Sequence, residues 1–255
     1  MNNNVKLSLI VTYRQRENHL KSLMKWWETD RAKKICDLCE IILVEVDVLP
    51  SKFIQEYLYK DNFQYLHLDD GGLFHKTKAL NMGLLHSQGQ YIAAFDVDLI
   101  PISDTLLKHL EMAQLSPQLL ITGYRVMSDL EMIDEFNTSI DFSSNIITNT
   151  SVAPEDKETA LWKHLIRKER FGVVPLFERQ RLLEIGGWDE KFIGWGGEDQ
   201  DIIERYLESG RYLCRSPELV YLHLSHPPNP GWNEPHLVEE NRKHYYNKMQ
   251  SRNNM

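Results

Sequence analysis

The stretch Phe95–Pro101 (FDVDLIP) carries two carboxylates, Asp96 and Asp98, directly after an apolar run. Side chains two residues apart lie on the same side of a strand, so both would face one ligand if the backbone stays extended. At a corner between a strand and a loop, they can instead divide between a metal ion and a ribose. Carboxylates that leave several coordination positions open suit manganese or magnesium bridging a diphosphate. The alternative is an ordinary polar strand end, because an isolated D-x-D is common.

A second candidate ligand set lies in Tyr221–Pro227 (YLHLSHP). His223 and His226 are three residues apart, so a helical turn or a tight loop could bring both rings to one point. Imidazole suits a transition metal better than calcium, and carboxylate with histidine therefore favours manganese. The alternative is two ordinary histidines among the ten in the chain.

The segment Gly187–Ile202 surrounds Trp195 with glycines and continues with the acids Glu198, Asp199 and Asp201. Glycines allow a tightly bent or mobile backbone, and an indole offers a face on which a sugar can stack. A carboxylate in a partly dry site can accept the proton of an attacking hydroxyl. The alternatives are a helix start with acids in its first turn, which the helix dipole favours, and a tryptophan in the core.

Strands and helices are predicted to alternate along the chain, from apolar runs and from apolar residues at helical spacing. The expected strands are Val5–Thr12, Glu40–Val48, Phe63–Leu68 and Tyr91–Phe95. The expected helices are His19–Thr29, Phe53–Lys60, Lys76–Ser87, Pro154–Arg170 and Asp199–Ser209. This alternation predicts an α/β fold with a mostly parallel sheet and helices on both faces. Ligands collect at the carboxyl ends of such strands, where Asp96 and Asp98 fall.

Two further segments give weaker expectations. Met127–Pro154 is polar and irregular, which is typical of a functional or mobile loop. Lys248–Met255 is expected to be frayed.

Composition excludes several classes of protein. The chain has 255 residues and a net charge of −8, which argues against a nucleic-acid surface. Three cysteines are too few for a disulfide framework and favour a reducing compartment. Cys36 and Cys39 form a C-x-x-C, but no second pair accompanies them, so we expect buried cysteines at a helix end. No apolar run is long enough for a signal or a membrane span. A cytoplasmic protein is therefore expected, peripheral to the inner face of a membrane through its acceptor.

Five motifs in order resemble the GT-A glycosyltransferases of the β-1,4-galactosyltransferase type, including the chondroitin-type bacterial transferases. They are VTYRQRENHL (Val11–Leu20), FHKTKALNMG (Phe74–Gly83), FDVDLIP, WGGEDQD (Trp195–Asp201) and HLSH (His223–His226). The resemblance runs from Val11 to about His226. A lone D-x-D is weak, whereas this ordered set is specific.

The resemblance implies a role for each matching residue. The nucleotide and donor would be bound by Arg14, Arg16, Phe74, Lys76, Asp96 near the ribose, and Trp195. The metal ligands would be Asp98, His223 and His226. Glu198 and Trp195 would shape the sugar sites, and Asp199 would be the catalytic base.

The same resemblance implies one GT-A domain over residues 1–255. Its nucleotide-binding half would span about 1–100, and its acceptor-binding and catalytic half about 101–245. The implied activity is metal-dependent, inverting transfer of a sugar from a UDP-sugar to a hydroxyl of a saccharide or glycolipid. The sugar would be a hexose or N-acetylhexosamine, with a galactose-type sugar favoured. The implied setting is the synthesis of a surface polysaccharide or glycan. Manganese is the expected ion, with magnesium as the alternative. A retaining N-acetylgalactosaminyltransferase-like enzyme and a catalytically silent carbohydrate- or nucleotide-binding protein are the rival hypotheses.

Three departures leave the donor sugar open. Gln200 stands where the family usually has a third acid, Phe171–Val173 replaces F-G-G, and Arg170 lies at a position that helps to select the sugar. The region Met127–Arg170 has no counterpart in the family, so the resemblance leaves the identity of the acceptor open. The Trp195 loop, Ile193–Gly197, is expected to be mobile without ligand and ordered over the donor.

Overall fold

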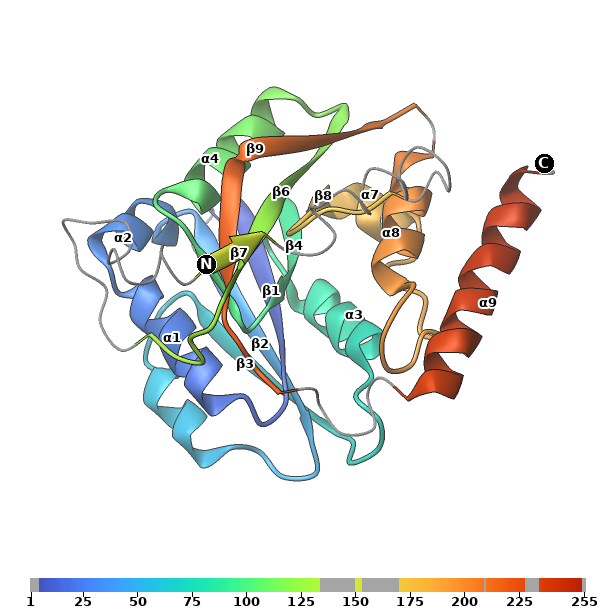
Figure 1. Ribbon diagram of the computed structural model, residues 1–255. Helices are drawn as coiled ribbons and strands as arrows, with labels where there is room; N and C mark the ends of the chain where they lie inside the picture. Colours follow the sequence, from blue (N-terminus) through green and yellow to red (C-terminus); the bar gives the residue numbers. More distant parts are fainter. Residues whose placement is uncertain (1–4, 134–149, 153–169, 209, 228–233, 254–255) are drawn as a thin grey trace.

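The computed structural model describes residues 5–133, 150–152, 170–208, 210–227 and 234–253. Its central sheet has the strand order β3-β2-β1-β4-β8, in which the first four strands are parallel and β8 is antiparallel (Figure 1). The strands are β1 (Leu7–Tyr13), β2 (Cys39–Asp47), β3 (Phe63–Asp69), β4 (Tyr91–Asp96) and β8 (Leu176–Glu178). The predicted α/β fold with a mostly parallel sheet is confirmed.

Strand β1 shows why the sheet is covered on both faces. All seven of its residues are buried, and successive side chains point to opposite faces. Leu9 and Val11 join one apolar cluster, whereas Ile10 joins the other. The first cluster is covered by α1 (Glu17–Trp27), α2 (Asp30–Cys36) and α4 (Thr105–Leu115), and the second by α3 (Lys76–His86) and α8 (Glu198–Leu207).

A second sheet, with the order β5-β9-β6-β7, meets the first next to Asp98. Its strands are β5 (Leu99–Pro101), β9 (Tyr212–His223), β6 (Leu119–Ser128) and β7 (Thr150–Val152). Only Val97 and Asp98 separate β4 from β5, so the chain passes between the sheets through the acidic motif. Strand β9 runs parallel to β6 and antiparallel to β5.

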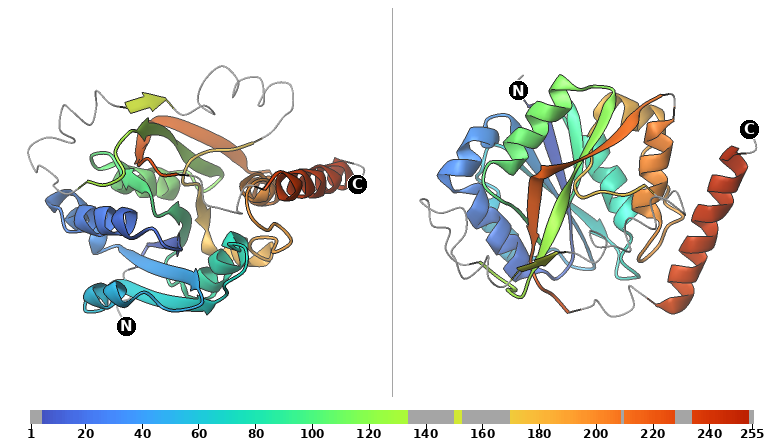
Figure 2. Two further views of the ribbon diagram at one scale, coloured as in Figure 1. Left: turned by 60° about the horizontal axis from the view of Figure 1, so that its bottom comes forward. Right: turned by 45° about the horizontal axis from the view of Figure 1, so that its top comes forward.

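The C-terminal helix α9 (Pro235–Asn253) lies at the edge of the molecule beside α8 (Figures 1 and 2). The short α7 (Arg179–Glu184) follows β8. The expectation that Lys248–Met255 is frayed was wrong for Lys248–Asn253, which continue the helix. Their ion pairs with α8, described below, give the physical reason.

The other predicted elements lie within a few residues of those observed, with two qualifications. The predicted helix Phe53–Lys60 is a 3₁₀ helix, Lys52–Tyr57. The predicted helix Pro154–Arg170 and most of the loop Met127–Pro154 lie outside the described residues. Cys36 ends α2 and Cys39 begins β2, and both thiols are free. In the part of the chain that the structure describes, no helix has the length and apolar character needed to cross a membrane.

Candidate active site

Asp98, His223 and His226 form a compact group where the two sheets meet. Each offers one ligand atom, and these atoms lie within 4.8 Å of one another. The Nε2 atom of His226 is 3.1 Å from Asp98 Oδ2, and that of His223 is 3.6 Å from Asp98 Oδ1. The structure thus brings together the three residues predicted as metal ligands.

Backbone pairing explains how residues so distant in sequence meet. Leu99 of β5 pairs with His223 of β9, and the Leu224 N–H donates to the Asp98 carbonyl at 2.9 Å. Asp98 and His223 therefore lie side by side at the ends of adjacent strands. Strand β9 ends at His223, and the chain beyond it turns so that His226 faces Asp98. This is a strand end rather than the helical turn that the three-residue spacing also allowed.

The pKa shifts of Asp98 and His223 favour the forms that can bind a divalent metal ion. Burial opposes ionisation of Asp98, but the hydrogen bond from His226 and the positive charge of Arg16 lower the pKa of Asp98 to about 2. Burial lowers the pKa of His223, so its imidazole is neutral at neutral pH and keeps a lone pair. The hydrogen bond with Asp98 raises the pKa of His226.

Two buried polar atoms of the same group lack hydrogen-bond partners among the described residues. They are Asp98 Oδ1 and His223 Nδ1. Buried polar atoms in proteins are almost always satisfied, so such atoms call for an explanation. A transition-metal ion is commonly bound by a mixture of carboxylate and imidazole groups, and such an ion would satisfy these atoms. The residues present therefore fit a metal such as manganese.

His19 lies beside this group, and the sequence prediction missed it. Its ring centroid is 5.9 Å from that of His226, and its Nε2 is 3.0 Å from the Ser225 carbonyl oxygen. His19 thereby supports the segment that carries His226. The signal was present in the first motif, VTYRQRENHL, but only the arginines were assigned roles there.

The two arginines of that motif occupy different places. The Arg14 guanidinium donates to the carbonyls of Val46, Asp70 and Gly72, the last two at 2.6 and 2.7 Å. It also lies 5.4 Å from the ring centroid of Phe74, which is only 7% exposed. Arg14 therefore joins the end of β2 to the loop that follows β3. The assignment of Arg14 and Phe74 to the nucleotide stays a prediction.

Arg16 lies instead beside the proposed metal ligands. Its Nη1 atom is 3.9 Å from Asp98 Oδ2, and both side chains are largely buried. A guanidinium at this distance favours the ionised carboxylate. The structure thus places Arg16 where it stabilises the charged form of Asp98, while its predicted contact with the nucleotide is untested.

Lys76, the first residue of α3, lies among three carboxylates. Its Nζ is 3.2 Å from Asp96, 3.8 Å from Glu198 and 3.8 Å from Asp199. Burial alone would lower the pKa of Lys76, but these carboxylates together raise it above its ordinary value. Lys76 is therefore a permanent cation that links the end of β4 to the start of α8. Asp96 and Asp98 face different partners, as expected for a corner rather than an extended strand.

Glu198 and Asp199 are neighbours with contrasting environments. Glu198 is 7% exposed, and its Oε2 accepts a hydrogen bond from the Gly196 N–H at 3.1 Å. Burial, reinforced by Asp199 and opposed by Lys76, raises the pKa of Glu198 to about 7. The Asp199 side chain is 54% exposed, so it is open to an incoming hydroxyl.

Trp195 projects from the glycine-rich loop into solvent. It is 57% exposed, which excludes the alternative that it is a core residue. Gly194, Gly196 and Gly197 have φ values of 73°, 103° and 90°, in the left-handed region that favours glycine. A Cβ at Gly196 would meet no atom within 4 Å, whereas one at Gly197 would meet Phe192. The indole is therefore available for a ligand, and the predicted mobility of its loop stays a prediction.

The site as a whole carries excess negative charge. Lys76 and Arg16 form ion pairs with Asp96, Asp98 and Asp199, which outnumber these two cations even when Glu198 is protonated. A dication would offset this excess, and an anionic diphosphate could then bind beside it. The arrangement has a candidate metal-binding group, a cation, an accessible carboxylate and an exposed indole.

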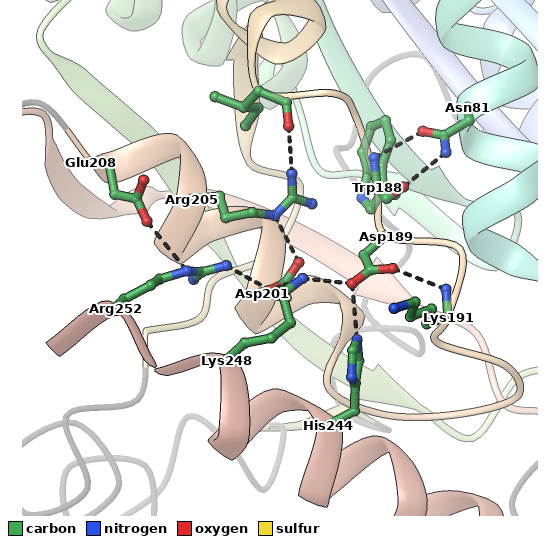
Figure 3. A network of polar contacts seen from close by, with 11 residues as sticks. Asn81, Trp188, Asp189, Lys191, Asp201, Arg205, Glu208, His244, Lys248 and Arg252 are labelled. Carbon is green, nitrogen blue, oxygen red and sulfur yellow. Dashed lines mark hydrogen bonds and ion pairs between the residues drawn. The ribbon is translucent and has the colours of Figure 1, made fainter. Parts of the chain in front are cut away.

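Asp189 and Asp201 form a separate polar network with α9 that the sequence prediction missed (Figure 3). Asp201 follows Asp199 in the motif but contacts Arg205 at 2.8 Å and Lys248 at 2.8 Å rather than Lys76. Asp201 therefore serves the packing of α8 on α9. The sequence contained a clue to this role. Asp201 comes two residues after Asp199, and residues two apart on a helix point to different sides.

The fold and site together define a GT-A glycosyltransferase, and comparisons with known proteins agree. The chain is 27% identical over 187 residues to chondroitin sulfate N-acetylgalactosaminyltransferase 1 of Mus musculus, covering 70% of this chain and 30% of that protein. It is 22% identical over 223 residues to beta-1,4-galactosyltransferase 1 of Mus musculus, covering 84% and 40%. The crystal structure of GalNAc-T7 with UDP, GalNAc and Mn²⁺ superposes with a TM-score of 0.60 at 14% identity, covering 96% and 47%.

The chain belongs to the glycosyltransferase like family 2, whose model matches residues 23–229. It spans less than half the length of each of these relatives. The predicted family and fold are thereby confirmed, and the chain contains a glycosyltransferase domain. The inverting mechanism, the metal, the donor sugar and the roles of single residues remain proposals.

Proposed function

We propose that this glycosyltransferase is a metal-dependent, inverting enzyme that transfers a hexose or N-acetylhexosamine from a UDP-sugar to a saccharide hydroxyl. One observation carries the proposal. The group Asp98, His223 and His226 lies at the carboxyl end of β4, as do Lys76 and the three carboxylates that surround it. The names of the relatives support a galactose-type sugar, since they include a galactosyltransferase and an N-acetylgalactosaminyltransferase. Surface polysaccharide or glycan synthesis is the setting that we propose.

Asp98, His223 and His226 would hold the metal ion. When bound, such an ion offsets the negative charge of a leaving diphosphate. The chemistry of the donor set favours manganese over magnesium, because two of the three ligands are imidazoles. The GalNAc-T7 crystals contain Mn²⁺ and UDP, which is consistent with this choice.

Lys76 would stabilise the departing UDP from the other side of the site. Its ammonium remains charged because the surrounding carboxylates favour the protonated form. Asp96 lies 3.2 Å from the same ammonium, so it orients the lysine. Asp96 would in addition contact the ribose, as the resemblance implied.

Asp199 would act as the general base on the acceptor hydroxyl. Its carboxylate is half exposed and 3.8 Å from Lys76, so an acceptor can reach it next to the donor. It would remove the proton as the acceptor oxygen attacks the anomeric carbon and the bond to UDP breaks. Glu198 and Trp195 would shape the sugar sites, and closure over the donor would exclude water.

A donor screen tests the proposal. The protein would be incubated with Mn²⁺ and each of several UDP-sugars, with and without oligosaccharide acceptors, and released UDP would be measured. Acceptor-stimulated release, and a product of inverted anomeric configuration, are expected. A retained configuration would contradict the single displacement. Tight UDP-sugar binding without any release would identify a silent binding protein.

We also propose that the protein works in the cytoplasm, at the inner face of a membrane that holds its acceptor. The free thiols of Cys36, Cys39 and Cys214 support a reducing compartment. Cell fractionation tests this proposal. Recovery of the protein from an oxidising compartment would contradict it.

A further inference from the structure

Asn241 of α9 binds the backbone of the Trp195 loop. Its side chain is 5% exposed, and Nδ2 lies 2.8 Å from the Ile193 carbonyl oxygen and 3.1 Å from that of Trp195. An amide nitrogen carries two hydrogens, so one is available for each carbonyl. Both partners are acceptors, which fixes the orientation of the amide. Asn241 thus joins two carbonyls on either side of Gly194.

The Trp195–Gly196 peptide connects Asn241 to Glu198. Its carbonyl accepts from Asn241, and its N–H donates to Glu198 Oε2 at 3.1 Å. The carbonyl and the N–H of one peptide lie in a single plane and point in opposite directions. Asn241 therefore orients the N–H toward Glu198. Gly196, with φ at 103°, would offer little steric resistance if this peptide rotated.

The network with α8 fixes the position of Asn241. Residues three or four apart share one face of a helix, and α9 uses that spacing from Asn241 onward. His244 and Lys248 contact Asp189 Oδ2 at 2.9 and 2.6 Å, and Lys248 also contacts Asp201. The remaining pairs join Arg252 to Asp201 and to Glu208 (Figure 3). Because Asp201 is 1% exposed, these ion pairs are shielded from solvent on one side.

We propose that Asn241 is a positioning residue for sugar transfer, acting through the Trp195–Gly196 peptide on Glu198 and on the Trp195 indole. The proposal rests on the proposed function, in which both groups belong to the sugar sites. Asn241 itself touches neither donor nor acceptor in this scheme. Its loss should release the loop while leaving the metal group and Lys76 in place.

The test compares Asn241→Ala and Asn241→Asp with wild-type protein and with Asn247→Ala. Asp keeps the size of Asn but has no amide hydrogens, so it removes both bonds without leaving a cavity. Asn247 is exposed on the same helix, so its variant controls for changes to α9. The measurements are steady-state kinetics for the acceptor, UDP-sugar binding, and hydrogen exchange of each backbone amide.

Both Asn241 variants should reduce kcat/KM for the acceptor by about 10- to 100-fold, as expected for a misplaced reacting group. UDP-sugar affinity should change much less than kcat/KM, because the proposed nucleotide and metal ligands lie on other elements. Amides of residues 193–197 should exchange about tenfold faster, while those of β1 and α3 keep their rates. Asn247→Ala should match the wild type in every measurement.

Wild-type exchange at residues 193–197 in both Asn241 variants would overturn the proposal. Faster exchange throughout the protein, β1 included, would also overturn it, because that outcome indicates a purely structural role. If the wild-type protein turns over no UDP-sugar, the proposed function fails. The exchange measurements would still decide whether Asn241 positions the loop.

Discussion

Replacing Glu198 by glutamine should stabilise the folded protein at alkaline pH while impairing transfer. Gln has the shape of a protonated Glu and retains an oxygen that can accept the Gly196 N–H. The variant therefore imitates the state that the buried site favours. The prediction therefore separates two effects of this carboxylate, namely the stability that its ionisation costs the folded protein and its contribution to transfer.

The magnitude follows from the pKa of Glu198, which burial raises from 4.5 to about 7. At about 1.4 kcal/mol for each pKa unit, ionisation of Glu198 in the folded state costs about 3 kcal/mol. The folded protein holds this proton up to about pH 7, whereas the unfolded chain releases it near pH 4.5. The stability of the wild-type protein relative to the variant is therefore highest below about pH 4.5 and falls as the pH rises toward 7.

Thermal and urea unfolding with a chelator present measure this difference at about pH 5 and about pH 8. From about pH 5 to about pH 8, the stability of Glu198→Gln relative to wild type should increase by about 2–3 kcal/mol, or roughly 5–10 °C in Tm. Glu111→Gln makes the same chemical change at an exposed position on α4 and should show no such increase. A difference between Glu198→Gln and wild type that is independent of pH would refute the reasoning.

Three other predictions concern activity. Chelation should abolish transfer and Mn²⁺ should restore it better than Mg²⁺, so full turnover in excess chelator would remove the metal role of Asp98 and its histidines. Asp199→Asn should reduce the transfer rate by about 10²–10⁴-fold with UDP-sugar affinity nearly unchanged. UDP release measures turnover in both variants. If Asp199→Asn turns over at a near-normal rate and Glu198→Gln is inactive, Glu198 is the base. Trp195→Ala should raise the acceptor KM but change the free energy of unfolding by less than about 1 kcal/mol, because the indole is 57% exposed. A loss of several kcal/mol in a urea titration would contradict its placement.

The sequence predicted the central sheet well because its strands are buried on both faces. Such strands are continuous apolar runs, as in β1 and β2, and their order along the chain leaves few parallel topologies. The grouping of Asp98 with His223 and His226 was also predictable, since the three residues belong to specific motifs. The distances within it were not, because they depend on the pairing of Leu99 with His223.

Helix α9 was missed for a physical reason. Its residues are polar on nearly every side, so no apolar stripe marks it as a helix. Its packing depends on ion pairs whose partners, Asp189 and Asp201, lie about fifty residues earlier. Strand β9 was equally hard to predict, because Arg215, Ser216 and Pro217 interrupt its apolar pattern.

The position of α9 in the chain has a consequence for biosynthesis. Domains generally fold during synthesis with the earlier residues first. The proposed metal ligands and catalytic acids are all present once His226 has been made, but Asn241 and its cationic neighbours follow later. Until they emerge, the carbonyls of Ile193 and Trp195 lack the amide that binds them in the finished protein. A nascent chain would therefore bring its proposed metal ligands together before the Trp195 loop takes its final conformation.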